Sequence, residues 1–174
     1  MEKGKSKLAV RSTGAEDNKS LTFSNDLWAS SFHKKVLLVL QRANFDLPFS
    51  IQVDACDVGM GAVLLQEDTH SGLMHPICFH SEKFNVSQRN YSTIEKECLS
   101  IILSLRKFNF FIYDSPHRVI IQCDHNPLKF ISKMKNHNQR LMRWAMELQD
   151  YSVDVVHIRG KDNVIADCLS RMYM

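Results

Sequence analysis

Two features that would place a protein in a specialised class are missing from this sequence. The longest uninterrupted apolar run, Val36–Leu40, is far shorter than the roughly 20 residues that cross a bilayer, so we expect no membrane span, no membrane partner and no signal peptide. The five cysteines are odd in number, widely spaced and include no Cys-x-x-Cys pair. This pattern is typical of reduced thiols in a cytoplasmic or nuclear protein, and it disfavours a structural zinc ion.

A large net charge is missing as well. The formal value of +3 is too small to identify a nucleic-acid partner from the total, so the distribution of charge along the chain matters more. The remaining composition, 44% hydrophobic and 24% charged, is ordinary for a soluble globular protein. With 174 residues, the chain can bury a real core as one domain, with or without an extension.

The first part of the chain differs from the rest. Residues 1–25 are polar, mixed in charge and without apolar periodicity, so we expect a disordered segment or a linker. Residues 26–45 form a second segment, in which the apolar spacing predicts an amphipathic helix over Asp26–Ala43. That helix could pack on the main domain, which we expect over residues 46–174, or on a partner outside this chain.

Strand and helix patterns follow one another through residues 46–174. Alternation and turn signals predict strands over Phe49–Ala55, Ala62–Gln66, Met74–Phe84, Arg118–His125 and Ser152–His157. Helical spacing predicts a long helix capped by Ser92 or Thr93, and further helices over Leu128–Met134, Gln139–Gln149 and Val164–Met172. This order predicts an α/β fold: a five-stranded mixed sheet made of a three-strand antiparallel meander and two parallel strands, with helices packed on it.

Two of these strands carry nearly the same four residues, Ile51-Gln52-Val53-Asp54 and Ile121-Gln122-Cys123-Asp124. Successive side chains of a strand point to opposite faces, so each glutamine shares a face with the aspartate two residues later. If the strands are adjacent and parallel, both aspartates stand at the carboxyl ends, where open α/β sheets place their active sites. Carboxylates that close repel each other unless a cation lies between them, so we interpret Asp54 and Asp124 as half of a metal site.

Five motifs give the chain a family resemblance. In order they are VDACDVGMGAVLLQ, NYSTIEKECLSI, CDHNPLKF, NQRLMRWAMELQDY and GKDNVIADCLSR. Together they resemble the ribonuclease H domain of Gypsy-type LTR retrotransposon reverse transcriptases, over about Asp46–Arg171. The segment Leu27–Phe49 resembles the connection that joins this domain to the polymerase part. The resemblance implies a ribonuclease H-like fold, an RNA–DNA hybrid as substrate and a reverse transcriptase polymerase domain as a candidate partner.

The resemblance also implies a set of catalytic carboxylates. It places four metal ligands in the motifs VDA, EKE, CDH and ADCLSR, at Asp54, Glu97, Asp124 and Asp167. The helical pattern alone does not choose between Glu95 and Glu97, whereas the resemblance chooses Glu97. Mg²⁺, or Mn²⁺ in its place, prefers oxygen ligands, and two ions about 3.5–4 Å apart can activate a water and stabilise the leaving oxygen of a phosphodiester.

We therefore expect two-metal, endonucleolytic hydrolysis of the RNA strand of RNA–DNA hybrids during reverse transcription. One alternative is a host-captured or inactive module that binds nucleic acid or protein without turnover. The other is a strand-transferring integrase of the same broad fold class, which the absence of a His/Cys zinc module disfavours.

Further residues are candidates for contact with nucleic acid. We expect Gly59-Met60-Gly61 to form a tight turn whose exposed amides read the 2′-hydroxyls of RNA, with an ordinary hairpin turn as the alternative. Thr93, just before Glu97, is a candidate for contact with the DNA strand. A run of four basic residues has no acidic neighbour until Glu147, which favours a phosphate-binding rim over a solvated helix face. These four are Lys133, Lys135, Arg140 and Arg143.

His157 is the last candidate. It ends the fifth strand, ten residues before Asp167, a spacing that resembles the mobile-loop histidine of cellular and retroviral ribonucleases H. The loop over Arg159–Asp162 could let the imidazole swing toward the metals, where it would move a proton or assist product release. A histidine that only closes an edge strand is the alternative.

Overall fold

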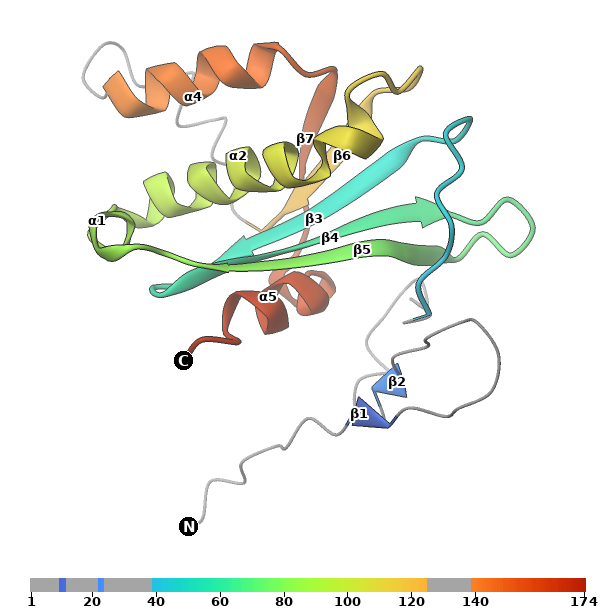
Figure 1. The fold of residues 1–174 in the computed structure, drawn as a ribbon, viewed down its shortest axis with the longest axis horizontal. Helices are drawn as coiled ribbons and strands as arrows, with labels where there is room; N and C mark the ends of the chain where they lie inside the picture. The colour runs from blue at the N-terminus through green and yellow to red at the C-terminus, as the bar shows by residue number, and fades with distance from the viewer. Residues whose placement is uncertain (1–9, 12–21, 24–38, 125–138) are drawn as a thin grey trace.

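The sheet of the main domain has the predicted arrangement. The computed structural model describes residues 10–11, 22–23, 39–124 and 139–174 (Figure 1). Adjacent strands pair antiparallel from β5 to β3 and parallel from β3 to β7. The predicted fold class, a meander joined to two parallel strands, is therefore confirmed. In spatial order, the strands are β5 (Met74–Lys83), β4 (Gly59–Glu67), β3 (Phe49–Ala55), β6 (Val119–Cys123) and β7 (Val153–His157).

Helix α2 (Thr93–Ile112) packs along one face of the sheet (Figure 1). Of the two predicted caps, Ser92 is the correct one. Its hydroxyl accepts a hydrogen bond from the Glu95 backbone N–H, and its own N–H donates to the Glu95 carboxylate. The apolar stripe of the helix includes Leu105 and Phe108, both 0% exposed, in one core with residues of β3, β4 and β6. The cap and the stripe together hold the first turns of α2 in a fixed position on the sheet.

The other helices of the described residues are shorter than α2. α1 (Val86–Arg89) links β5 to α2, and η1 (Gly160–Asp162) follows β7. α4 (Gln139–Gln149), predicted with the same bounds, lies beside α2, where Arg106 and Glu147 form a bidentate ion pair at 2.6 and 2.7 Å. α5 (Val164–Ser170) lies on the other side of the sheet from α2 and packs on β4 and β3 (Figure 1). The central strands β3 and β4 are thus covered from both sides.

The segment Gly59-Met60-Gly61 is not the turn that the sequence predicts. It is buried at the start of β4, paired with β5 and β3, and the connection from β3 is confined to residues 56–58. A Cβ on Gly61 would lie 2.3 Å from the carbonyl oxygen of Ala166 and 2.4 Å from the backbone nitrogen of Ser170. Glycine is needed here because the backbone of α5 packs directly on β4. The predicted exposure of these amides is therefore wrong, and with it their proposed reading of RNA 2′-hydroxyls.

Some predicted elements lie wholly or partly outside the described residues. Of the helix predicted over Asp26–Ala43, only residues 39–43 are described, and these are not helical. In the segment predicted as disordered or linker, β1 (Val10–Arg11) pairs antiparallel with β2 (Thr22–Phe23). The helix predicted over Leu128–Met134 lies outside the described residues. Within the described ranges, no helix is both long enough and apolar enough to cross a membrane.

Candidate metal centre

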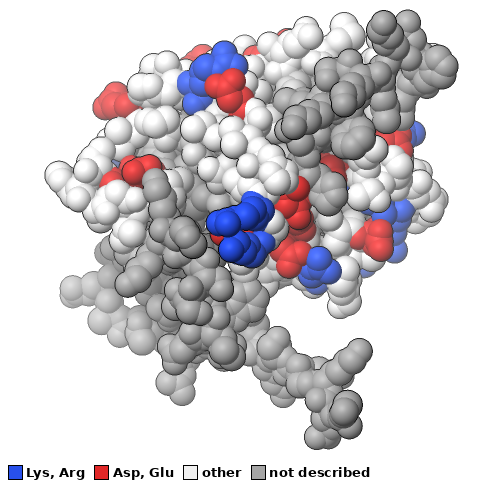
Figure 2. Space-filling model, turned by 180° about the vertical axis from the view of Figure 1, so that it is seen from behind, with Lys and Arg blue, Asp and Glu red and all other residues white. Residues whose placement is uncertain are grey.

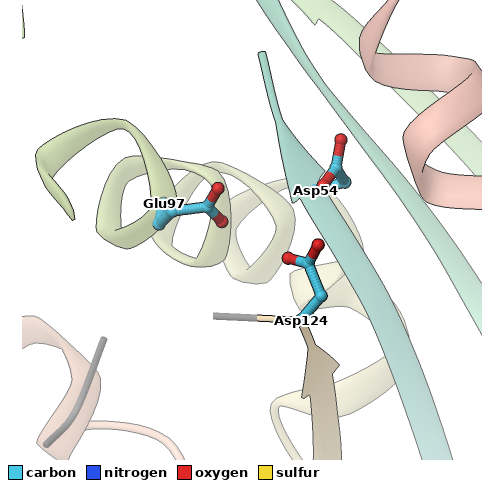
Figure 3. A group of neighbouring side chains, drawn as sticks. All are labelled: Asp54, Glu97 and Asp124. Carbon is cyan, nitrogen blue, oxygen red and sulfur yellow. The ribbon is translucent and has the colours of Figure 1, made fainter. Parts of the chain in front are cut away.

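The two aspartates of the repeated motif lie together, as the sequence predicts. Parallel pairing of β3 with β6 sets Gln52 opposite Gln122 and brings the carboxyl ends of both strands to one edge of the sheet. Asp54, Glu97 and Asp124 each place a carboxylate oxygen so that the three atoms lie within 4.8 Å of one another. Figure 3 shows these side chains converging from β3, from α2 and from the end of β6. Glu97, and not Glu95, is the glutamate of this cluster.

A side-chain hydrogen bond joins the two strands just before the aspartates. Gln52 Nε2 donates to Gln122 Oε1 at 3.0 Å, and Gln52 is 8% exposed. Side chains two residues apart share a strand face, so this bond lies one step behind Asp54 and Asp124 along the strands. The repeat of glutamine and aspartate was visible in the sequence, but the contact between the two glutamines was not predicted from it.

Burial makes the cluster electrostatically unfavourable on its own. Asp54 is 6% exposed and Glu97 is 4% exposed. Burial, followed by the charges of Asp124 and Asp167, raises the pKa of Asp54 to about 6, and a hydrogen bond from Ser170 Oγ at 2.6 Å opposes this shift. Burial, followed by the charges of Asp54 and Asp124, raises the pKa of Glu97 to about 8. A divalent cation between these groups would remove the repulsion and favour all three ionised forms.

The donor set fits a hard divalent cation. The cluster consists of carboxylates, with neither histidine nor cysteine, which favours Mg²⁺ or Mn²⁺ over zinc. Donors that share one Mg²⁺ ion lie at most about 4.2 Å apart, because each bond is about 2.1 Å long. Three oxygens within 4.8 Å therefore need only small side-chain rotations to bind one ion in common.

Asp167 does not belong to this group of three. It lies in the first turn of α5, with its side chain 44% exposed, and Arg171 binds it at 2.6 Å one helical turn further on. Its charge nevertheless acts on Asp54, whose pKa it helps to raise. The implied fourth carboxylate is thus near the cluster but held by Arg171, a partner that the sequence does not indicate.

His157 ends β7 at the same edge of the sheet. It is exposed and lies opposite Cys123, the residue before Asp124, in the parallel pairing of β6 with β7. The chain then turns back across this edge, so that a Cβ on Gly160 would lie 3.3 Å from Asp124 Oδ2. The loop predicted at this point is the short helix η1, and its close approach to Asp124 was not expected.

The predicted nucleic-acid contacts have different surroundings. Thr93 lines a cleft beside Glu97, between the end of β3, the first turn of α2 and the residues that follow α5. Arg140 forms an ion pair of 2.6 Å with Glu95 and stacks over the ring of Tyr91 at 3.8 Å. Arg143 Nε donates to the carbonyl oxygen of Gln139 at 3.3 Å. Lys133 and Lys135 lie outside the described residues.

The predicted basic run is therefore not isolated from acidic groups. In the sequence, no acidic residue lies close to Arg140 before Glu147, but Glu95 of α2 reaches it from a distant part of the chain. Figure 2 shows the same pattern on the face opposite to that of Figure 1, where basic and acidic side chains of the described residues lie in small mixed groups. Phosphate binding by Arg140 would have to compete with an existing carboxylate partner.

Comparison with known proteins identifies the domain. Residues 44–151 match the family described as the RNase H-like domain found in reverse transcriptase, and the chain belongs to this family. It is 38% identical over 128 residues to the retrovirus-related Pol polyprotein from transposon opus of Drosophila melanogaster, covering 74% of this chain and 12% of that protein. It is 35% identical over 134 residues to the corresponding polyprotein from transposon gypsy of the same species, covering 77% and 12%. The chain thus spans only a small part of these relatives, and the resemblance inferred from the five motifs is confirmed.

Solved structures share the fold. Prototype foamy virus protease-reverse transcriptase aligns with a TM-score of 0.57 at 15% identity, over 69% of this chain and 16% of that chain. LC11-RNase H1 in complex with an RNA/DNA hybrid aligns with a TM-score of 0.51 at 14% identity, over 70% of this chain and 92% of that chain. At these identities the likeness establishes a ribonuclease H fold and nothing finer.

Proposed function

We propose that this domain cleaves the RNA strand of RNA–DNA hybrids endonucleolytically, as part of retrotransposon reverse transcription. The observation that carries the proposal is the buried cluster of Asp54, Glu97 and Asp124 at the carboxyl ends of two parallel strands. Its membership of a reverse transcriptase RNase H-like family supports the same reaction. So does the hybrid bound by LC11-RNase H1, which shares the fold.

The cluster is proposed to hold two Mg²⁺ ions, with Mn²⁺ as a substitute. When bound, such ions supply a water nucleophile at neutral pH and stabilise the leaving oxygen. The residues of the chain provide position: Asp54 is held by Ser170, Glu97 by the capped helix α2, and Asp124 by the end of β6. Because each ligand comes from a different packed element, little reorganisation is needed on metal binding.

Asp167 is proposed as the fourth ligand. It already acts electrostatically on Asp54, and it lies on the helix that supplies Ser170. To join the cluster, it would exchange its ion pair with Arg171 for a contact with a cation. The exchange is feasible because both partners are about half exposed, with side-chain exposures of 55% for Arg171 and 44% for Asp167.

His157 is proposed as an auxiliary proton carrier. Its position opposite Cys123 places it at the edge of the sheet where Asp124 lies, and its exposure leaves the imidazole free to reorient. Thr93, Lys133, Lys135, Arg140 and Arg143 remain proposed contacts with nucleic acid. The polymerase part of a reverse transcriptase is the proposed protein partner, and the cytoplasm or nucleus is the proposed location.

The test is cleavage of a 5′-labelled RNA annealed to DNA, with Mg²⁺ or with EDTA, and with RNA–RNA and DNA–DNA duplexes as controls. We expect Mg²⁺-dependent cleavage of the RNA in the hybrid alone, giving a 3′-hydroxyl and a 5′-phosphate. Asp124→Asn removes one ligand charge without changing the shape of the side chain, and it should abolish cleavage while preserving the melting temperature in EDTA. Turnover near the parent rate in that variant would remove Asp124 from the catalytic centre.

The same assay separates the alternative of a binding module without turnover. That alternative predicts binding of the hybrid by the parent protein but no cleavage at any Mg²⁺ or Mn²⁺ concentration. Strand joining in place of hydrolysis would instead support the integrase-like alternative.

A further inference from the structure

The cleft beside Glu97 has two basic residues in its wall. Lys96 comes from the first turn of α2, and Arg171 directly follows α5 on the other side. Each of them is bound by a carboxylate: Lys96 by Asp57 at 2.9 Å and Arg171 by Asp167 at 2.6 Å. The cleft is lined by Glu97, one member of the carboxylate cluster, and it also presents two cations, both in contact with acidic side chains.

The ion pair of Lys96 is strongly asymmetric. The side chain of Lys96 is only 10% exposed, whereas that of its partner Asp57 is 91% exposed. Asp57 lies in the short connection between β3 and β4, and its side chain has solvent rather than packed protein around it. The cation is therefore held in place by the protein, while the anion that neutralises it is displaceable.

Stability does not account for this lysine. Burying an ammonium group is unfavourable, and an ion pair with an exposed partner returns little of that cost. The first turn of a helix is also the end that disfavours positive charge. A cation retained at such a position, adjacent to Glu97 and facing a cleft, is better explained by an anionic ligand that enters the cleft.

We propose that Lys96 binds a phosphodiester group of the nucleic acid, and that the Asp57 carboxylate occupies its place in the free protein. The inference rests on the proposed function, because it assumes that the cleft receives the RNA–DNA hybrid. On binding, a phosphate oxygen takes over the contact with Lys96 Nζ, and Asp57 moves into solvent. Asp57 is thus an internal competitor of the substrate, and Lys96 is a residue that positions the strand next to Glu97.

This arrangement predicts opposite effects for the two members of one ion pair. Lys96→Met removes a phosphate contact, so hybrid binding should weaken several-fold. The slope of the logarithm of the binding constant against the logarithm of the salt concentration should also become shallower by about one. Asp57→Asn removes the competitor, so binding should tighten several-fold. A pair that is only structural would give the same direction of change for both substitutions, or no change.

The measurement is fluorescence anisotropy of a labelled RNA–DNA hybrid in EDTA, over a range of salt concentrations. Lys107→Met and Asp114→Asn are the control variants, because both residues are exposed and lie far from the cleft. Lys107 is about 16 Å further along the axis of α2 than Lys96, and Asp114 lies beyond the end of that helix. Both controls should leave affinity and salt slope close to the parent values. Circular dichroism and melting temperature establish folding, and Lys96→Gln replaces Lys96→Met if the latter does not fold.

The double variant separates competition from a general charge effect. If Asp57 acts by occupying Lys96, the gain from Asp57→Asn should largely disappear in the Lys96→Met background. An equal gain in both backgrounds would mean that Asp57 only repels nucleic acid at a distance, and this would overturn the proposal. Unchanged affinity in Lys96→Met would overturn it as well.

Two further results show which strand of the hybrid Lys96 contacts, and whether the phosphate contact or the proposed cleavage activity is refuted. With neutral methylphosphonate linkages in the DNA strand, loss of the Lys96→Met effect would assign the contact to DNA, and its persistence would assign it to RNA. If the parent binds the hybrid with the predicted effects but does not cleave it, the phosphate contact stands and the proposed activity fails. If the parent cleaves but the variants match it in affinity, only the phosphate contact is refuted.

Discussion

Gly160 lies so close to Asp124 that a Cβ at this position would be 3.3 Å from the carboxylate oxygen Oδ2. This is the closest non-neighbouring atom to that Cβ, and the next, at 4.0 Å, belongs to the same aspartate. The loop that follows β7 therefore lies close beside a candidate metal ligand.

Gly160→Ala should weaken metal binding more than it weakens the fold. The added methyl group must push the Asp124 carboxylate by a few tenths of an ångström, or be pushed by it, which misplaces a ligand. We expect the Mg²⁺ concentration for half-maximal cleavage to rise several-fold, while the melting temperature in EDTA stays within a few degrees of the parent. A lower melting temperature with an unchanged Mg²⁺ requirement would show that the contact is structural.

Asp167→Asn and Arg171→Gln, compared side by side, test whether Asp167 is a ligand. Both substitutions break the same ion pair. If Asp167 joins the metals, Asp167→Asn should lower the cleavage rate at least tenfold more than Arg171→Gln does. If Asp167 serves only to hold Arg171, the two variants should have the same rate. Mg²⁺-induced stabilisation, measured by thermal denaturation, gives a readout that does not depend on turnover.

The raised pKa values predict how the stability of the metal-free protein depends on pH. The ordinary pKa of Glu97 would be 4.5 and that of Asp54 would be 3.8, whereas the folded values are about 8 and about 6. Below the ordinary pKa values, the folded protein and the unfolded chain both hold these protons. The free energy of unfolding then does not change with pH through these two groups. Between about pH 4 and pH 8 the folded protein keeps protons that the unfolded chain releases, so the free energy of unfolding falls as pH rises.

The melting temperature in EDTA should therefore decrease over this pH range. Metal ions compete with protons for the carboxylates, so the rise in melting temperature caused by Mg²⁺ should be larger at pH 8 than at pH 5.5. Glu97→Gln has no titrating group at this position, and it should flatten the pH dependence in EDTA. An equally steep decrease in that variant would assign the effect to other groups.

His157→Ala should slow cleavage by roughly 10²-fold, the low end for a positioned acid–base group, without loss of hybrid or metal binding. The rate should be measured from pH 6 to pH 9, together with affinity for the hybrid. A parent rate across this range would leave His157 as a residue that closes an edge strand. Complete inactivity, as expected for Asp124→Asn, would be too large for an auxiliary role.

Most of the fold can be predicted from local sequence patterns. The bounds of β3 and α4 were predicted correctly, because alternation and helical spacing are properties of neighbouring residues. The repeated motif predicts that Asp54 and Asp124 lie together if the two strands are parallel, and the structure has this arrangement. Glu97 could not be chosen over Glu95 on spacing, and it required the family resemblance.

The misjudged residues are those whose partners are distant in sequence. The local sequence around Gly61 indicates a turn. The reason for glycine at this position is its close approach to Ala166 and Ser170, which are more than a hundred positions further on. Arg140 was interpreted as lacking an acidic neighbour because Glu95 reaches it from another helix. Such contacts are set by how elements pack, which local composition does not encode.

The contact between Gly61 and α5 has a consequence for the metal centre. α5 supplies Ser170, which holds Asp54, and Asp167, the proposed fourth ligand. The separation of these groups from β3 is fixed where one main chain rests on another, with no side chain between them as a spacer. Side chains can change rotamer or be replaced by others of similar volume, but two touching backbones have no such adjustment. The distance between α5 and the sheet is therefore set by direct backbone contact at Gly61. Gly61→Ala would force the two apart and move Ser170 and Asp167 relative to Asp54.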